Sequence, residues 1–302
     1  MTPSHRKPSG PPLTPARDLP WTVASPFRMQ PGLAHLAQGG HALFVRDALA
    51  ARYAEHKQQV LREQPERTGL GHADPAVLKA VAEAYGRETG QELVPSAEAL
   101  TLGMQEDFVV LQDGTGAGAT GLCARFLSVC FPSNWDPADK LGRDFLAIHA
   151  PVADNARLLA GASGIVDLAF RRASMLRHVW LLSPDPALAQ HPHKRRLRWD
   201  DAVGAADAPG ASGRLLDQVF FRVERQTTLP LPDLTSAVFF IRVMVCPLTE
   251  VLAVQAGRAQ ALHAALASMS DAVWVYRGMD RVRARLLAEL ATVLDPNPGA
   301  AP

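Results

Sequence analysis

The sequence predicts an α+β fold with five strands in the middle of the chain and helices before, between and after them. Helical periodicity is found at residues 40–89 and 252–294, whereas the part between them holds short apolar runs bounded by glycine and proline. Two such runs precede a helical stretch and three follow it. The 302 residues are 47% hydrophobic and 20% charged, a globular balance that is sufficient to bury one sizeable core.

Both ends of the chain have the composition of disordered segments. Residues 1–20 contain repeated prolines without a periodic apolar pattern, and residues 295–302 are rich in Pro, Gly and Ala. Ordered structure is expected to start near Trp21. We therefore predict a single domain over residues 21–294, flanked by disordered tails at 1–20 and 295–302.

Two helices are predicted before the first strand. Residues 40–62 place Leu43 and Tyr53 on one face, with polar residues on the other. Residues 75–89 form the second helix, and Gly90 is a typical residue to end it.

The first two strands are predicted at residues 107–112 and 122–131. Asp113 and Gly114 begin the glycine-rich turn between them, and Pro132 closes the second strand.

A helix with a strong start signal follows the second strand. Asp136 is a suitable N-cap, and Pro137 occupies the first helical position. The apolar pattern carries this helix to about Ile148, and Pro151 stops it. A further helix is predicted within residues 155–175.

The second half of the chain contains three more strands and two helices. The strands are predicted at 177–182, 218–227 and 237–246, and the helices at 252–269 and 279–294. The loop 183–213 is long for a compact domain, and such loops are often functional.

Charge and hydropathy exclude several classes of protein. The formal net charge of +1 argues against a broad surface for nucleic acid. The one basic cluster, residues 193–198, is predicted to be a solvated loop. No run approaches the roughly 20 apolar residues that span a bilayer, and residues 1–20 lack the apolar centre of a signal peptide. The expected location is therefore the cytoplasm.

The cysteines do not form a recognisable metal or disulfide pattern. Cys123, Cys130 and Cys246 lie in apolar, strand-like runs and lack the spacing of zinc or iron–sulfur ligands. The sequence also lacks a glycine-rich dinucleotide-binding motif.

Several motifs, in a fixed order, carry a resemblance to a known family. They are Met-Gln-Glu-Asp-Phe at 104–108, Val-Cys-Phe-Pro-Ser-Asn-Trp-Asp-Pro at 129–137, Lys-Leu-Gly at 140–142, Ile-His-Ala-Pro-Val at 148–152, Arg-Val-Glu-Arg-Gln-Thr at 222–227, Phe-Phe-Ile-Arg at 239–242 and Tyr-Arg-Gly at 276–278. On these motifs the chain resembles the haem-dependent oxidative N-demethylases, specifically their haem-binding (alpha) subunit, over residues 27–278. The chain departs from the family pattern at 177–180 and at 228–230, which weakens the inference about the substrate.

The resemblance implies a fold, a cofactor and partners. The fold would be PAS-like, with a five-stranded antiparallel sheet, haem-enclosing helices and added helices at both ends. The activity would be the oxygen-dependent removal of a methyl group from a small secondary amine, such as dimethylamine, at haem b. NADPH, FMN and a 2Fe–2S cluster would belong to a partner reductase subunit, and tetrahydrofolate would accept formaldehyde on a partner as well.

His149 is the histidine that we expect to bind the haem iron. It follows the helix that Asp136 caps and precedes Pro151, where the chain is rigid. Iron needs a neutral ring, so a ligand there must lose its second proton or gain a backbone acceptor for its other nitrogen. A surface histidine that complements the helix dipole is the alternative. His178 and a Cys130 thiolate are the reserve ligands.

Arg225 is the expected catalytic residue. Strand alternation places it on the same face as the apolar Val223, where a guanidinium needs an anion or a strong acceptor. A haem propionate or reduced oxygen would supply one, and an ion pair with Glu106 or Asp107 is the alternative.

Four further residues complete the predicted site. Glu224 and Gln226 belong to the opposite face of the strand, or to the site if a bulge shifts the register. Lys140 and Arg143 could reach haem propionates, or lie on a solvated helix face. The competing functions are a haem-based PAS sensor or carrier without catalysis, related haem chemistry on a different amine, and a haem-free binding protein that kept only the fold.

Overall fold

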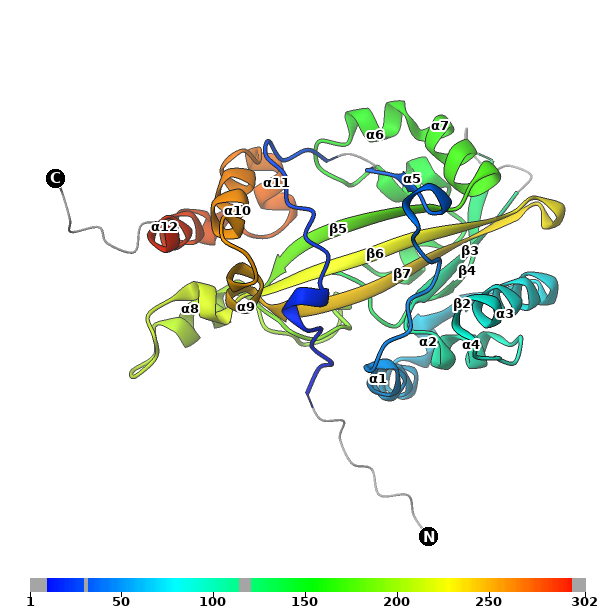
Figure 1. Ribbon diagram of the computed structural model, residues 1–302, viewed down its shortest axis with the longest axis horizontal. Helices are drawn as coiled ribbons and strands as arrows, with labels where there is room; N and C mark the ends of the chain where they lie inside the picture. Colours follow the sequence, from blue (N-terminus) through cyan, green and yellow to red (C-terminus); the bar gives the residue numbers. More distant parts are fainter. Residues whose placement is uncertain (1–9, 30–31, 114–120, 295–302) are drawn as a thin grey trace, which may run out of the picture.

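A computed structural model describes residues 10–29, 32–113 and 121–294 of the chain (Figure 1). Within these ranges the strands form one antiparallel sheet in the order β1-β5-β6-β7-β3-β4-β2. The α+β class is therefore confirmed. The predicted tails at 1–9 and 295–302, and most of the glycine-rich turn, lie outside the described residues.

Five long strands form the centre of the sheet at the predicted places. They are β3 (Asp107–Asp113), β4 (Leu122–Ser128), β5 (Met175–Ser183), β6 (Phe220–Leu231) and β7 (Ser236–Pro247). The predicted number of five is wrong for the described sheet, because β1 (Ala34–His35) extends it at β5 and β2 (Gly69–Gly71) extends it at β4. These edge strands are too short to show an alternating pattern in the sequence.

Four α-helices that precede β3 in the chain pack near the β3–β4 side of the sheet (Figure 1). They are α1 (Ala50–Glu63), α2 (Pro65–Thr68), α3 (Pro75–Thr89) and α4 (Ala97–Gly103). The second predicted helix is confirmed as α3, which Asp74 caps and Gly90 ends at φ 70°. The first begins ten residues later than predicted, because the chain around Leu43 and Val45 instead offers its carbonyls to arginines of the sheet.

The helix predicted from Asp136 to Ile148 is divided into two. Asp136 does cap a turn, η3 (Pro137–Lys140), but Gly142 then adopts φ 74° and the chain bonds to Ala124 on β4. A second helix, α5 (Phe145–His149), starts at its own cap, Asp144. Three short helical segments follow: α6 (Ala156–Ala160), α7 (Ala162–Asp167) and η4 (Leu168–Arg172).

The second half of the chain contains shorter helices than the sequence predicts. The long loop carries α8 (Trp199–Ala206), and η5 (Leu215–Gln218) precedes β6. After the sheet come α9 (Leu248–Ala253), α10 (Arg258–Ala267), α11 (Asp271–Tyr276), η7 (Asp280–Val282) and α12 (Arg283–Leu294). The described chain has no helix long and apolar enough to cross a membrane.

The segment before the first helix is held against the sheet, although the sequence predicts disorder up to residue 20. The Thr14 N–H donates to Val245 O on β7 at 2.8 Å, and Leu19 is 3% exposed in the core under α9–α12. Proline-rich composition is compatible with an extended chain whose few apolar side chains find a partner surface. The disorder prediction is therefore wrong for residues 10–20.

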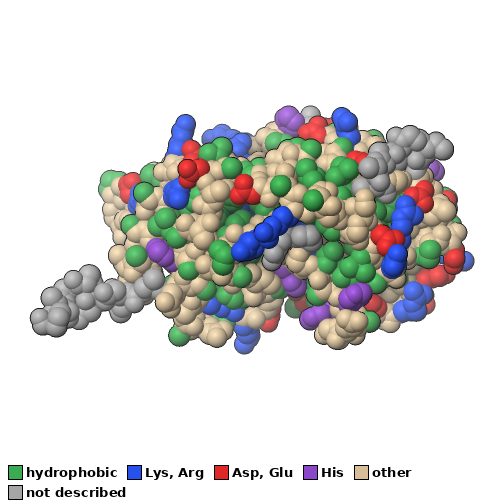
Figure 2. Space-filling view, turned by 90° about the horizontal axis from the view of Figure 1, so that it is seen from above, with side chains coloured by type: hydrophobic (Ala, Val, Ile, Leu, Met, Phe, Trp, Pro, Cys, Tyr) green, Lys and Arg blue, Asp and Glu red, His purple; other side chains and the backbone are tan. Residues whose placement is uncertain are grey.

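The two faces of β6 differ in what covers them. Phe221 and Val223 lie in the core formed with α9–α12, whereas Arg222, Glu224 and Gln226 line a cavity on the other face. On the surface seen in Figure 2, basic and acidic side chains are interspersed, as the near-neutral charge of the chain suggests.

Candidate active site

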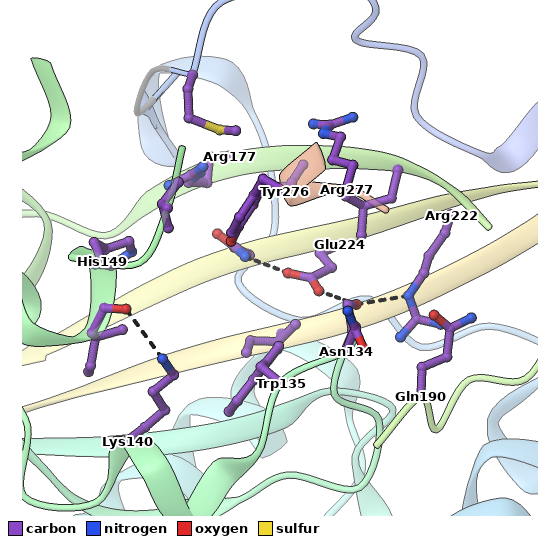
Figure 3. Close-up of a pocket in the computed structure, with 18 of the residues that line it drawn as sticks. Asn134, Trp135, Lys140, His149, Arg177, Gln190, Arg222, Glu224, Tyr276 and Arg277 are labelled. Atoms are coloured by element: carbon purple, nitrogen blue, oxygen red, sulfur yellow. Dashed lines mark hydrogen bonds between the residues drawn. The ribbon is translucent and has the colours of Figure 1, made fainter. Parts of the chain in front are cut away.

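A cavity of about 670 Å³ lies on the face of the sheet that carries Glu224, within the range typical of sites for cofactors and small molecules. Its walls come from the sheet, from α5–α7 and from the loops after β4 and β5. Figure 3 places His149 and Lys140 toward one end of the cavity, and Asn134, Arg222 and Gln190 toward the other. Much of the lining is apolar, including Val109, Leu111, Phe145, Leu158, Phe170 and Phe239.

His149 lines this cavity from the last residue of α5. Its Nδ1 lies 2.8 Å from Phe145 O, and a carbonyl can only accept, so Nδ1 carries the proton and Nε2 keeps a lone pair. Burial, helped by the cations of Arg177 and Lys140, lowers the pKa of His149 to about 4. The Asn155 amide fixes the end of the helix by donating to His149 O at 3.0 Å. The side chain is thus a neutral, oriented imidazole.

Glu224 is the carboxylate of the cavity wall, and it is 8% exposed. Its Oε1 accepts a hydrogen bond from Ser133 Oγ, and its Oε2 accepts one from Gln226 Nε2 at 2.7 Å. The two donors fix the carboxylate plane. The cations of Arg177 and Arg222 also interact electrostatically with Glu224. Within the described chain neither arginine donates a hydrogen bond to this carboxylate, so it can still accept one from an ammonium group that enters the cavity.

Arg222 holds together the loop after β4 and the loop after β5, which form the cavity wall beside Glu224. Its Nε donates to Ser133 Oγ at 2.8 Å, and its terminal nitrogens donate to carbonyls on both loops, including Phe131 O and Leu188 O. The side chain is fully buried and is hydrogen-bonded at each end of its planar fork. We assign Arg222 a positioning role, because its donors are used for holding Ser133 and the loops.

Two other arginines of the cavity lack such partners. Arg177 on β5 and Arg277 after α11 line it, yet no described residue accepts a hydrogen bond from the side chain of either. The buried Nε of Arg177, and the buried Nε and Nη1 of Arg277, are unpaired within the described chain. Burial lowers the pKa of Arg277 to about 10. Unpaired buried donors of this kind are costly unless an anion meets them.

The two predicted basic residues of the helical region have different positions. Lys140 lines the cavity, donates to Ile148 O at 3.3 Å, and has a pKa that burial lowers. Arg143 is exposed and does not line the cavity. Its prediction as a cavity residue is wrong, because after the break at Gly142 the Arg143 backbone is bonded to Ala124 of β4 and the side chain is exposed.

Arg225 lies on the opposite face of the sheet from the cavity, so its predicted position in the site is wrong. Strands β5, β6 and β7 pair there without a bulge, and alternation keeps Arg225 away from Glu224. Its Nη1 donates to Leu43 O at 3.0 Å, and Nη2 donates to Ala42 O. Backbone carbonyls are the strong acceptors that satisfy the guanidinium, in place of a haem propionate, reduced oxygen or a carboxylate.

Neither reserve ligand lines the cavity. His178 pairs with Arg225 across the strands and shares its face. Cys130 is buried in a separate core cluster with Tyr53 and Val243, and burial together with Asp107 raises the pKa of its thiol far above the usual range.

His178 should contribute to the pH dependence of stability. Burial, followed by Arg225 and His41, lowers its folded pKa to about 4, below the ordinary value of about 6.5. Between these values the unfolded chain binds more protons, so the free energy of unfolding should rise with pH. Urea unfolding at pH 5 and pH 7 tests this: the rise should be smaller in His178→Gln than in the wild type. Equal rises would contradict the assignment.

The family model for haem-dependent oxidative N-demethylase, alpha subunit-like, matches residues 43–287. The chain belongs to this family. No curated protein matches it. The matched region contains His149, Glu224, Arg177 and Arg277, whereas the segment before Leu43 lies outside it.

The residues of the cavity fit the haem that the family description names. The cavity offers a neutral imidazole with a free Nε2, apolar walls for a porphyrin, and two arginines whose guanidinium groups have unpaired buried donors within the described chain. The described residues contain no cluster of three or more His, Cys, Asp or Glu that could hold a bare metal ion. A haem needs only one or two protein ligands, because the porphyrin supplies the others.

Sequence reasoning singled out His149, Lys140, Glu224 and Gln226, all of which line the cavity. It missed Ser133 and Arg177 as site residues, and quoted Arg277 only as part of a motif. Alternation on β6 places Arg222 on the same face as Glu224, but nothing local in the sequence shows which loops an arginine holds.

Proposed function

We propose that this chain is the haem-binding subunit of an oxygen-dependent oxidative N-demethylase that acts on a small secondary amine such as dimethylamine. The observation that carries the proposal is the joint presence, in one apolar cavity, of the neutral His149 imidazole and the Glu224 carboxylate. A five-stranded PAS-like core is part of the same proposal, with β1 and β2 as additions at its edges.

The bound cofactor would be haem b, with Nε2 of His149 as the protein ligand. When bound, haem supplies the redox-active iron on which oxygen chemistry depends. Phe145 O holds the proton on Nδ1, and this hydrogen bond strengthens the imidazole as a donor to a metal. Arg177, Arg277 and Lys140 would offset the negative charge of the haem carboxylates.

Glu224 would bind the substrate amine in its protonated form. Ser133 and Gln226 hold both carboxylate oxygens, so the amine nitrogen would be placed at a fixed position. The apolar walls exclude water around it, which strengthens the ion pair. Gln226 would act through Glu224 rather than on the amine itself.

The proposal includes partners for the electrons. We propose that NADPH, FMN and a 2Fe–2S cluster reside on a reductase subunit, and that tetrahydrofolate takes up formaldehyde on another subunit. The support is the family description as an alpha subunit, together with the lack of a nucleotide-binding motif in the sequence. We also propose a cytoplasmic location, where such partner subunits would be found.

The proposal is tested by titrating haem into the purified chain and then assaying dimethylamine. We expect one haem per chain, no formaldehyde with NADPH and oxygen alone, and steady formaldehyde formation once a flavin and iron–sulfur reductase is added. Haem binding without amine oxidation under any of these conditions would contradict the enzymatic proposal and favour a sensor or carrier. Steady oxidation without a reductase would contradict the partner proposal.

Glu224→Gln should weaken the use of the amine without displacing haem. The amide keeps the size and can still bond with Ser133, but it no longer attracts an ammonium group. An ionic hydrogen bond contributes about 1.5–3 kcal/mol, so kcat/KM should fall roughly tenfold to a hundredfold. Steady-state kinetics and the haem spectrum check this, with Glu98→Gln on the surface of α4 as the matched control. Unchanged kcat/KM would remove Glu224 from the substrate site.

A further inference from the structure

The segment formed by residues 21–29, here called the strap, crosses the sheet (Figure 1). Trp21 stacks on Phe221 of β6 at 5.3 Å between ring centroids. Phe27 meets Trp180 of β5 edge-on at 5.7 Å, and its N–H donates to Ser268 Oγ at 2.8 Å. Met29 lines the cavity itself. The strap precedes residues 43–287, so the family match does not include it.

Arg277 lies in the corner that the strap forms with β5. Its guanidinium carbon is 4.7 Å from the ring centroid of Phe27 and 5.0 Å from that of Trp180. Both contacts are cation–π interactions, and they fix the plane of the guanidinium without using its N–H donors. Nε and Nη1 are buried and unpaired within the described chain, while the residue lines the cavity.

An arginine in this position has the features of a preorganised anion site. Two aromatic rings restrict the side chain before a ligand arrives, so less conformational entropy is lost on binding. A planar fork with free donors matches a carboxylate, to which it can donate two parallel hydrogen bonds. The carboxylate that an apolar cavity of this size would receive with a porphyrin is a propionate.

We propose that the strap completes a carboxylate-binding subsite: Phe27, together with Trp180, positions Arg277 to bind a propionate of the haem. The inference rests on the proposed function, because it assumes that haem occupies the cavity. Arg277 is the binding residue, and Phe27 is a positioning residue that acts through it. The Phe27 end of the strap is therefore part of the cofactor site, although it lies outside residues 43–287, which match the family model.

The test compares haem with its dimethyl ester, in which both propionates are blocked. Each is titrated into the full chain and followed by the Soret absorption. Arg277→Leu should weaken haem binding by about tenfold to a hundredfold, the range of a hydrogen bond to a charged group, and leave ester binding unchanged. Phe27→Leu should weaken haem binding severalfold and should also leave the affinity for the dimethyl ester unchanged. The double variant should bind haem no more weakly than Arg277→Leu alone.

Trp21→Leu is the matched control, because Trp21 anchors the same strap but contacts Arg258 rather than Arg277. It should leave haem binding unchanged. A loss equal to that of Phe27→Leu, or an equal loss of haem and ester in Arg277→Leu, would mean that these residues only support the fold, and would overturn the inference. If Arg277→Leu fails to fold, Phe27→Leu still decides by its haem-to-ester ratio. Failure of the wild type to bind either porphyrin would overturn the proposed function itself.

Discussion

His149→Ala should abolish stable haem binding and leave the chain folded. The side chain lines the cavity and is half-buried, so its loss removes few packing contacts. Its neutral Nε2 is, in the proposal, the one protein bond to iron, and apolar contacts with the porphyrin would not replace it. The measurement is a haem titration followed by Soret absorption, with circular dichroism to check the fold.

His178→Gln is the matched control for this experiment. His178 has an equally low pKa, also mainly from burial, but it lies on the other face of the sheet beside Arg225. This variant should bind haem as the wild type does. An unchanged Soret band in His149→Ala, or its loss in His178→Gln, would show that the iron ligand has been assigned to the wrong residue.

Of the variants proposed here, Lys57→Met should lose the most stability: its free energy of unfolding should fall by about 3–5 kcal/mol. Lys57 is fully buried on α1, with its Nζ 3.1 Å from Asp107 Oδ1 and 2.6 Å from Glu106 O. Methionine fills the same space, but it leaves the Asp107 carboxylate buried without its cation. Urea unfolding followed by circular dichroism measures the loss.

Two further variants make this prediction specific. Lys79→Met breaks an exposed pair with Glu83, whose side chains are 70% and 54% accessible, and should change stability by less than about 0.5 kcal/mol. Lys57→Met combined with Asp107→Leu removes both charges and should recover part of the loss. If the double variant is less stable than Lys57→Met, the cost lies in packing and not in the unpaired charge.

Loss of this pair should also reach the active site. Asp107 Oδ2 accepts the Phe131 N–H at 2.7 Å, and the same loop carries Ser133, which donates to Glu224. An unpaired Asp107 would disturb the loop that fixes the carboxylate. The geometry of the cavity wall thus depends on a buried charge pair that does not itself line the cavity.

Local patterns in the sequence determined the central elements of the fold. Helix α3 has a capping aspartate, an apolar face and a terminal glycine within 17 residues of chain, 74–90, so no distant contact is needed to define it. The five long strands could also be predicted, because each is an apolar run bounded by turn residues that lie close to it in the sequence. His149 was also found locally, through the motif around it.

Only the tertiary structure decided where Arg225 belongs. Alternation correctly separated it from Glu224, but the sequence could not show that the carbonyl of Leu43, 182 residues earlier, would satisfy the guanidinium. The same holds for Arg277. The rings of Phe27 and Trp180, which come from distant parts of the chain, hold its guanidinium group in place. Side-chain direction follows from local alternation, whereas the partner of a buried charge is set by long-range packing, because any carbonyl or ring of the chain can meet it.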